Sequence, residues 1–166
     1  ASRGLGDVYK RQIMKRLEGR EVMIVVDATK DLLLNVLEYH PFLIKPNNHE
    51  LGEIFGVELR SRQEVFPYAQ KLQEMGARNV LVSMAGEGAV LAAEDGCMFE
   101  APAPKGKLIN AVGSGDSMVA GFIAGWMEQK DYGHAFKMGI AAGSASAFSE
   151  YLATQEEIET IYHKIV

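Results

Sequence analysis

The sequence is poor in several features that would define particular classes of protein. It has one cysteine, Cys97, among 166 residues, so no disulfide can form within the chain, and this fits a reducing cytoplasm. No apolar run approaches the roughly 20 residues that a membrane-spanning helix needs. We find no secretory signal segment. We therefore expect a cytoplasmic protein, neither secreted nor spanning a membrane.

Charge and histidine also form no functional pattern. The formal net charge is −5, and neither sign forms a long run. This distribution argues against nucleic acid or a membrane surface as the main partner. The histidines are scattered without the spacing of a metal site, at positions 40, 49, 134 and 163. With 48% hydrophobic and 23% charged residues, the chain has the composition of a globular domain with one core.

The first twelve residues show neither helical nor strand periodicity, and the chain does not begin with methionine. We expect residues 1–12 to be a non-native leader that arose in cloning or sequence assembly. A genuine flexible loop is the alternative. Residues 13–166 would then be native, and the natural protein would be longer at its front.

Apolar strands alternate with amphipathic helices from residue 13 onward. We predict strands at 22–26, 42–45 and 79–83, a hairpin of 89–93 and 97–101, and helices at 13–18, 30–39, 49–55, 61–75, 117–129, 132–148 and 155–165. The strands lack polar alternation, which is typical of a sheet buried on both faces. The alternation predicts an α/β fold with a mostly parallel sheet, whose ligands bind beyond the carboxyl ends of strands.

The most informative stretch is residues 108–127. A strand-like apolar run ending at Val112 leads into Gly113, Ser114 and Gly115, and Asp116 comes next, ahead of a predicted helix. Two glycines around a serine allow backbone N–H groups to converge on an anion, and the helix start adds partial positive charge. A carboxylate would repel phosphate there unless it accepts a proton from the attacking group. The pattern indicates a phosphoryl-transfer site.

The same loop admits other interpretations. Asp is a favoured helix N-cap and Gly-Ser-Gly is ordinary loop chemistry, so Asp116 could be only a cap. Three better-known motifs fail. A Walker A loop needs lysine where Asp116 stands, the dinucleotide fingerprint needs a small residue at Met118, and a nucleophile elbow needs serine at Gly115.

A second polar group follows the strand predicted at 42–45. Lys45 could offer a point charge to a nucleotide phosphate, while Asn47 and Glu50 could hold hydrated Mg²⁺. The same spacing fits a capping box, in which Asn47 caps a helix and Glu50 closes it without any further function. Both interpretations stay open from the sequence.

Three weaker candidates lie elsewhere in the chain. Ser83, Gly86 and Gly88 belong to a turn that could approach a nucleotide, although a tight glycine turn explains them equally. Asp27 could face the same crevice or cap a helix. The small residues at 139–149 suit close helix packing, or a flat slot for adenine.

Three motifs in register carry a resemblance to a known family. They are the glycine loop and its flanks at 110–121, the N-x-x-E segment at 47–50 and the turn at 83–89. Together they resemble the ribokinase/PfkB family of carbohydrate kinases over residues 13–166. The resemblance implies a ribokinase-like three-layer αβα fold with a mostly parallel sheet. It also implies a truncated chain, the nucleotide-binding C-terminal half without the front half's sugar site and β-sheet lid.

The resemblance further implies ATP-dependent phosphorylation of a sugar phosphate, with fructose 1-phosphate converted to fructose 1,6-bisphosphate. Tagatose 6-phosphate and fructose 6-phosphate are alternative acceptors, and a non-catalytic nucleotide-binding module is the rival class. Small-molecule substrates, Mg²⁺, a monovalent cation near residues 146–153 and a homodimer would accompany this activity. The isolated fragment is expected to bind nucleotide weakly and to be inactive by itself.

The resemblance assigns roles to particular residues. Asp116 would be the catalytic base, and the N–H groups around Gly113, Ser114 and Gly115 would stabilise the transferring group. The remaining assignments are nucleotide contacts at Lys45, Asn47, Ser83, Gly86, Gly88 and Ser144, and magnesium contacts at Asn47 and Glu50.

Overall fold

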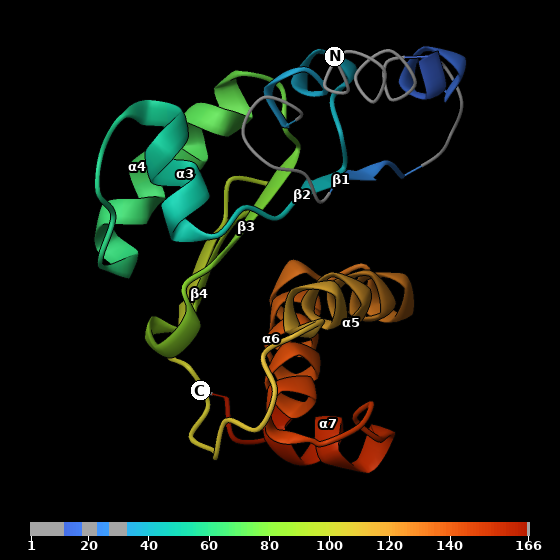
Figure 1. Ribbon diagram of the computed structural model, residues 1–166. Coiled ribbons are helices and arrows are strands. Elements are labelled where there is room, and N and C mark those ends of the chain that lie inside the picture. Colours follow the sequence, from blue (N-terminus) through green and yellow to red (C-terminus); the bar gives the residue numbers. More distant parts are fainter. Residues whose placement is uncertain (1–11, 18–22, 27–32, 166) are drawn as a thin grey trace, which may run out of the picture. The chain divides into compact units, whose positions relative to one another are not determined.

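The computed structural model describes residues 12–17, 23–26 and 33–165 (Figure 1). By their contacts the residues form two compact units, Ala1–Val82 with Val90–Met98, and Ser83–Ala89 with Phe99–Val166. Asp27 and the first residues of the helix predicted at 30–39 lie outside the described residues, as do residues 1–11.

A mostly apolar sheet provides the frame. Its strands are β1 (Val25–Val26), β2 (Leu43–Ile44), β3 (Asn79–Ser83), β4 (Ala89–Ala92) and β5 (Met98–Ala101), in that spatial order. β2 runs parallel to both β1 and β3, with Val25 opposite Leu43 and Ile44 opposite Val80. Burial of β2 to β4 is almost continuous rather than alternating, as expected for strands covered on both faces.

The predicted hairpin between β4 and β5 is confirmed. The N–H of Ala93 donates to the carbonyl of Cys97 over 2.9 Å and closes the turn. Gly96 takes a positive φ of 86° within it, a conformation that glycine adopts at little cost.

Two predicted elements near the N-terminus are shorter than expected. Of the strand predicted at 22–26, only Val25–Val26 form β1 among the described residues, although the carbonyl of Ile24 just before it accepts the N–H groups of Phe42 and Leu43. The helix predicted to reach Tyr39 gives way to a turn and a short 3₁₀ segment, Leu37–Tyr39. Weak helix formers at Asn35 and Val36 favour this break. His40 then adopts a left-handed conformation before Pro41.

The first unit also contains α3 (Asn48–Phe55) and α4 (Arg62–Glu74), which lie beside each other in Figure 1. α4 begins at Arg62 although Pro67 lies within it, so the proline does not delay the start of the helix. Its buried stripe is Val65, Ala69 and Leu72, while Met75, the C-cap residue, is 45% exposed.

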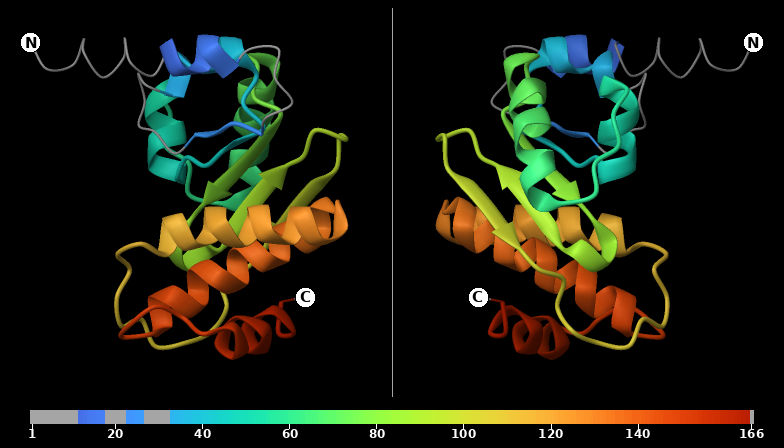
Figure 2. Two further views of the ribbon diagram at one scale, coloured as in Figure 1. Left: turned by 90° about the vertical axis from the view of Figure 1, so that its right-hand side faces the viewer. Right: turned by 90° about the vertical axis from the view of Figure 1, so that its left-hand side faces the viewer.

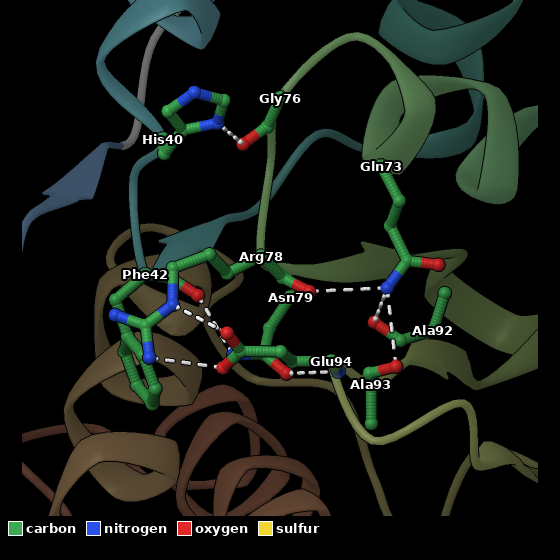
Figure 3. A network of polar contacts seen from close by, with 9 residues as sticks. All are labelled: His40, Phe42, Gln73, Gly76, Arg78, Asn79, Ala92, Ala93 and Glu94. Atoms are coloured by element: carbon green, nitrogen blue, oxygen red, sulfur yellow. Dashed lines mark hydrogen bonds and ion pairs between the residues drawn. The ribbon is translucent and has the colours of Figure 1, made fainter.

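Polar side chains join the strand ends of this unit (Figure 3). The fully buried Asn79 donates from Nδ2 to the carbonyl of Phe42 over 2.9 Å, and its Oδ1 accepts the N–H of Glu94 over 2.8 Å. Arg78 pairs with the carboxylate of Glu94 through two contacts of 2.8 and 2.9 Å. Gln73 donates to three backbone carbonyls, those of Arg78, Ala92 and Ala93. A buried asparagine is tolerated here because both ends of its amide are satisfied.

The second unit is dominated by α5 (Ser114–Gln129), α6 (Tyr132–Phe148) and α7 (Gln155–Tyr162). Figures 1 and 2 show α5 and α6 side by side. Glycines on both helices allow this approach, since a Cβ atom on Gly121 would lie 2.6 Å from the Cβ of Ala142. The packing interpretation of the small residues at 139–149 is therefore confirmed. No helix among the described residues is long and apolar enough to cross a membrane.

Candidate active site

The start of α5 leaves backbone donors open. Gly113 is its N-cap residue at φ 77°, and no side chain caps the helix. The N–H of Ser114 donates to the carbonyl of Ala111 over 3.2 Å, so that amide is used internally. Within the described part of the chain, the N–H groups of Gly115 and Asp116 have no hydrogen-bond acceptor. These two donors, with the helix dipole behind them, have the arrangement of a candidate anion-binding nest.

Asp116 stands at the third position of α5 and is exposed. It is not the N-cap residue, which is Gly113, so the alternative that it serves only as an N-cap does not hold. Among the described residues no ion pair or side-chain hydrogen bond holds its carboxylate. The group is therefore accessible to a proton donor beside the nest.

The segment before the nest is not the expected strand. Leu108 and Val112 are 65% and 83% exposed, and the segment pairs with no strand. Instead the N–H groups of Ile109 and Asn110 both donate to the carbonyl of Ala147, over 2.9 and 3.1 Å. Its β-rich composition favoured a strand, but the end of α6 takes up its hydrogen bonds. The expectation of a strand-like run leading into this loop is thus wrong.

The turn at 83–89 closes on itself. The N–H of Met84 donates to the carbonyl of Gly88 over 2.8 Å around a 3₁₀ segment, Ala85–Glu87. Gly88 has φ 96°, and a Cβ atom there would lie 2.0 Å from the carbonyl oxygen of Ala101. Gly86 is exposed with nothing near its Cβ position, and Ser83 is half-buried at the end of β3. Gly88 is therefore required by packing, while Gly86 is open to a ligand.

The capping-box interpretation of Asn47 and Glu50 is confirmed. Oδ1 of Asn47 accepts the N–H of Glu50 over 2.8 Å, and Oε2 of Glu50 accepts the N–H of Asn47 over 2.8 Å. Lys45, just after β2, is only 8% exposed, so most of its side chain lies against the protein. All three residues belong to the first unit.

The donor set near Glu50 suits a weakly held Mg²⁺ rather than a protein cage. No group of three or more His, Cys, Asp or Glu side chains among the described residues could hold a metal ion. Oε1 of Glu50 has no hydrogen-bond partner in the described ranges, and the residue is partly exposed. One carboxylate, with waters and ligand phosphates, is a common arrangement for Mg²⁺. Glu50 fits that arrangement, while the amide oxygen of Asn47 is already used.

The structure brings the turn of α6 that carries Ser144 against the nest. Ser144 is half-buried and directly follows Gly143, whose Cα faces the carbonyl oxygen of Ser114 closely enough that a Cβ atom would lie 3.0 Å away. Ala147 and Phe148, further along α6, lie in the stretch 139–149 noted in the sequence, but no contact with this loop was predicted for them. Their contacts with the loop have no periodic signal, because they join segments far apart in the chain.

Comparison with known proteins gives the class of this chain. A sequence profile of the pfkB family carbohydrate kinase matches residues 7–159. Phosphofructokinase-2 from Escherichia coli, solved in complex with substrates and products, superposes with a TM-score of 0.86 at 26% identity, over 95% of this chain and 52% of that one. Ribokinase from Arabidopsis thaliana, with a TM-score of 0.77 at 18% identity over 94% of this chain and 52% of that one, shares the fold. The chain belongs to the pfkB family of carbohydrate kinases, and the ribokinase-like α/β fold is confirmed.

Two curated relatives within this family show what the chain is similar to. The chain is 45% identical over 159 residues to 1-phosphofructokinase of Bacillus subtilis, covering 96% of this chain and 52% of that protein. It is 28% identical over 162 residues to D-tagatose-1-phosphate kinase of Klebsiella oxytoca, covering 98% and 53%. The chain thus spans about half the length of the curated relatives that it matches.

Proposed function

We propose that this chain is the nucleotide-binding half of an ATP-dependent sugar-phosphate kinase. The observation that carries the proposal is the start of α5, where two open N–H donors lie beside an exposed carboxylate that caps nothing. An anion nest with an adjacent base is what phosphoryl transfer to a hydroxyl requires. Membership of the carbohydrate kinase family supports the same reaction.

In the proposed reaction Asp116 accepts the proton of the acceptor hydroxyl as its oxygen attacks the γ-phosphorus of ATP. The N–H groups of Gly115 and Asp116 donate to the equatorial oxygens of the transferring group. Gly113 allows the chain to enter the helix without a side-chain cap, and Ser114 fixes the turn by donating from Oγ to the carbonyl of Ala111 over 2.8 Å. The leaving group is ADP.

The remaining contacts extend this assignment. Lys45 would contact ATP phosphates, and Glu50, with Asn47 beside it, would hold Mg²⁺ through water. When bound, Mg²⁺ neutralises phosphate charge during transfer. Ser83, Gly86, Gly88 and Ser144 would border the nucleotide. A monovalent cation near residues 146–153 and a homodimer belong to the same proposal.

The proposed acceptor is fructose 1-phosphate. The name of the Bacillus subtilis relative supports it at 45% identity, and the Klebsiella oxytoca relative makes a tagatose phosphate the second candidate. Because the chain spans about half of these relatives, we propose that the fragment binds nucleotide but does not turn over efficiently alone.

The test introduces the substitution Asp116→Asn into a full-length enzyme. In this enzyme the present chain takes the place of the matching segment of the Bacillus subtilis 1-phosphofructokinase. Loss of a general base should lower kcat by about 10²- to 10⁴-fold while ATP affinity is kept. The matched control is Asp131→Asn at the start of α6. Asp131 accepts the N–H of His134, and asparagine caps a helix equally well, so kcat should stay the same.

Two results would contradict the proposal. If Asp116→Asn kept the parent kcat, Asp116 would not be the base. If both variants lost rate equally, the effect would come from helix stability rather than chemistry. Steady-state rates with MgATP and fructose 1-phosphate, beside thermal melts, distinguish these outcomes.

A further inference from the structure

The last turns of α6 contact the nest and its leading segment at three separate points. The three residues that make these contacts are Gly143, Ala147 and Phe148, which we call the α6 platform. All lie in the second compact unit together with the nest.

The contact at Gly143 bears directly on a nest donor. A Cβ atom there would lie 3.0 Å from the carbonyl oxygen of Ser114 and 3.2 Å from the Cβ of Met118. The carbonyl of Ser114 and the N–H of Gly115 belong to the same peptide unit, which is planar and rigid. Anything that pushes this oxygen therefore also moves the N–H of Gly115, one of the two open donors.

The other two contacts hold the segment before the nest. The carbonyl of Ala147 accepts the N–H groups of both Ile109 and Asn110. The ring of Phe148 lies over the backbone of Gly106, so closely that a Cβ atom there would lie 2.3 Å from ring carbon Cε2. Two hydrogen bonds and a ring contact thus replace the sheet pairing that this segment lacks.

We propose that the α6 platform positions the anion nest, and that Gly143 is its most sensitive member. The inference rests on the proposed function, because it concerns the same nest. Beyond the proposed function, we infer that a residue of a second helix fixes the orientation of the N–H of Gly115. That residue is Gly143, which itself contacts no substrate. These are positioning residues and take no part in the chemistry.

The test uses the 166-residue chain itself, labelled with ¹⁵N and titrated with the magnesium complex of AMP-PNP, an ATP analogue that is not hydrolysed. The amide signals of Gly115 and Asp116 report binding, and a thermal melt reports stability. Gly143→Ala must shift the Ser114 oxygen by a few tenths of an ångström, and we expect binding to weaken about tenfold.

The matched control is Gly125→Ala at the other end of the same helix interface. A Cβ atom there would lie 2.9 Å from the Cβ of Met138 and 3.0 Å from the Cα of Ala135, so the packing strain is comparable. Gly125 is about 16 Å along α5 from Ser114. We expect a similar loss of Tm and little change in affinity.

Each outcome bears on one proposal. Equal weakening by both glycine variants, or unchanged affinity in Gly143→Ala, would overturn the positioning role. If the parent chain showed no shift of the Gly115 and Asp116 amides, the proposed function would fail, and this inference with it.

A second variant covers the case in which Gly143→Ala does not fold. Phe148→Leu reduces the ring contact with Gly106 without crowding the helix interface, and Phe136→Leu is its control in the same helix. We expect the Phe148 variant alone to weaken analogue binding, and equal effects would again overturn the positioning role.

Discussion

The starts of α3 and α5 make opposite use of the same backbone feature. Each helix begins with N–H groups that have no partner within the helix. At α3 the side chains of Asn47 and Glu50 satisfy two of these groups reciprocally. At α5 the N-cap is Gly113, and the donors of Gly115 and Asp116 stay open.

Among the described residues, the other α-helices whose caps are described also begin with a side chain that caps the helix. α4 and α7 begin with capping boxes at Ser61 and Thr154, and Asp131 caps α6. A side-chain cap contributes about 0.5–2 kcal/mol to the free energy of unfolding, so the absence of one at α5 lowers stability by a comparable amount. The comparison indicates that closed starts serve stability, whereas the open start of α5 keeps donors available for an anion.

Proline at the second helical position would test this difference most strongly. Gly115→Pro removes one open N–H, and proline is tolerated in the first turn, where no hydrogen bond is lost. Loss of one such donor should lower kcat of the full-length version by about 10²- to 10³-fold. Steady-state kinetics and thermal melts measure the two effects separately.

The same change at the same position of α3 is the control. His49 is exposed and also occupies the second helical position, so His49→Pro should alter rate and stability only slightly. Comparable rate losses in both variants would mean that the open donors of α5 have no special role.

A smaller effect concerns the closed start of α3 itself. Asn47→Ala removes a capping acceptor and should lower the free energy of unfolding by about 1 kcal/mol. Asn47→Ser restores a capping oxygen but not the amide, and should recover most of that stability. If Asn47→Ser also recovers the Mg²⁺ dependence of activity, Asn47 acts only as a cap. A loss of activity at normal stability would instead support a magnesium contact.

The features that could be predicted from the sequence depend on residues close together in the chain. The capping box at Asn47 and Glu50 depends on residues three apart, so spacing raised it as one of two interpretations, and the β4–β5 hairpin followed from a short polar turn. The α/β class followed from apolar strands that alternate with helices. The glycine loop before Asp116 was found because its residue types are consecutive.

Longer-range features were not predictable in the same way. The segment at 108–112 has strand-like composition, but its hydrogen-bond partner is Ala147, which is distant in the chain. The contact between Gly143 and the peptide of Ser114 likewise depends on how two helices pack. Such contacts depend on tertiary geometry, which periodicity does not encode.

The smallest expected effect is the pH dependence of the closed starts. Backbone N–H groups of Arg60 and Ser61 donate to Glu64 and lower its pKa below the usual 4.5, and Thr154 does the same for Glu157. A lowered folded pKa means that the stabilisation is present above the unfolded pKa and disappears as pH falls through the folded value. Glu64→Gln and Glu157→Gln should therefore be less stable than the parent at neutral pH, and this difference should shrink as pH falls below about 4.5. Thermal melts across that pH range measure the stability difference. A difference that stays constant with pH would show that these carboxylates do not cap their helices in the charged form.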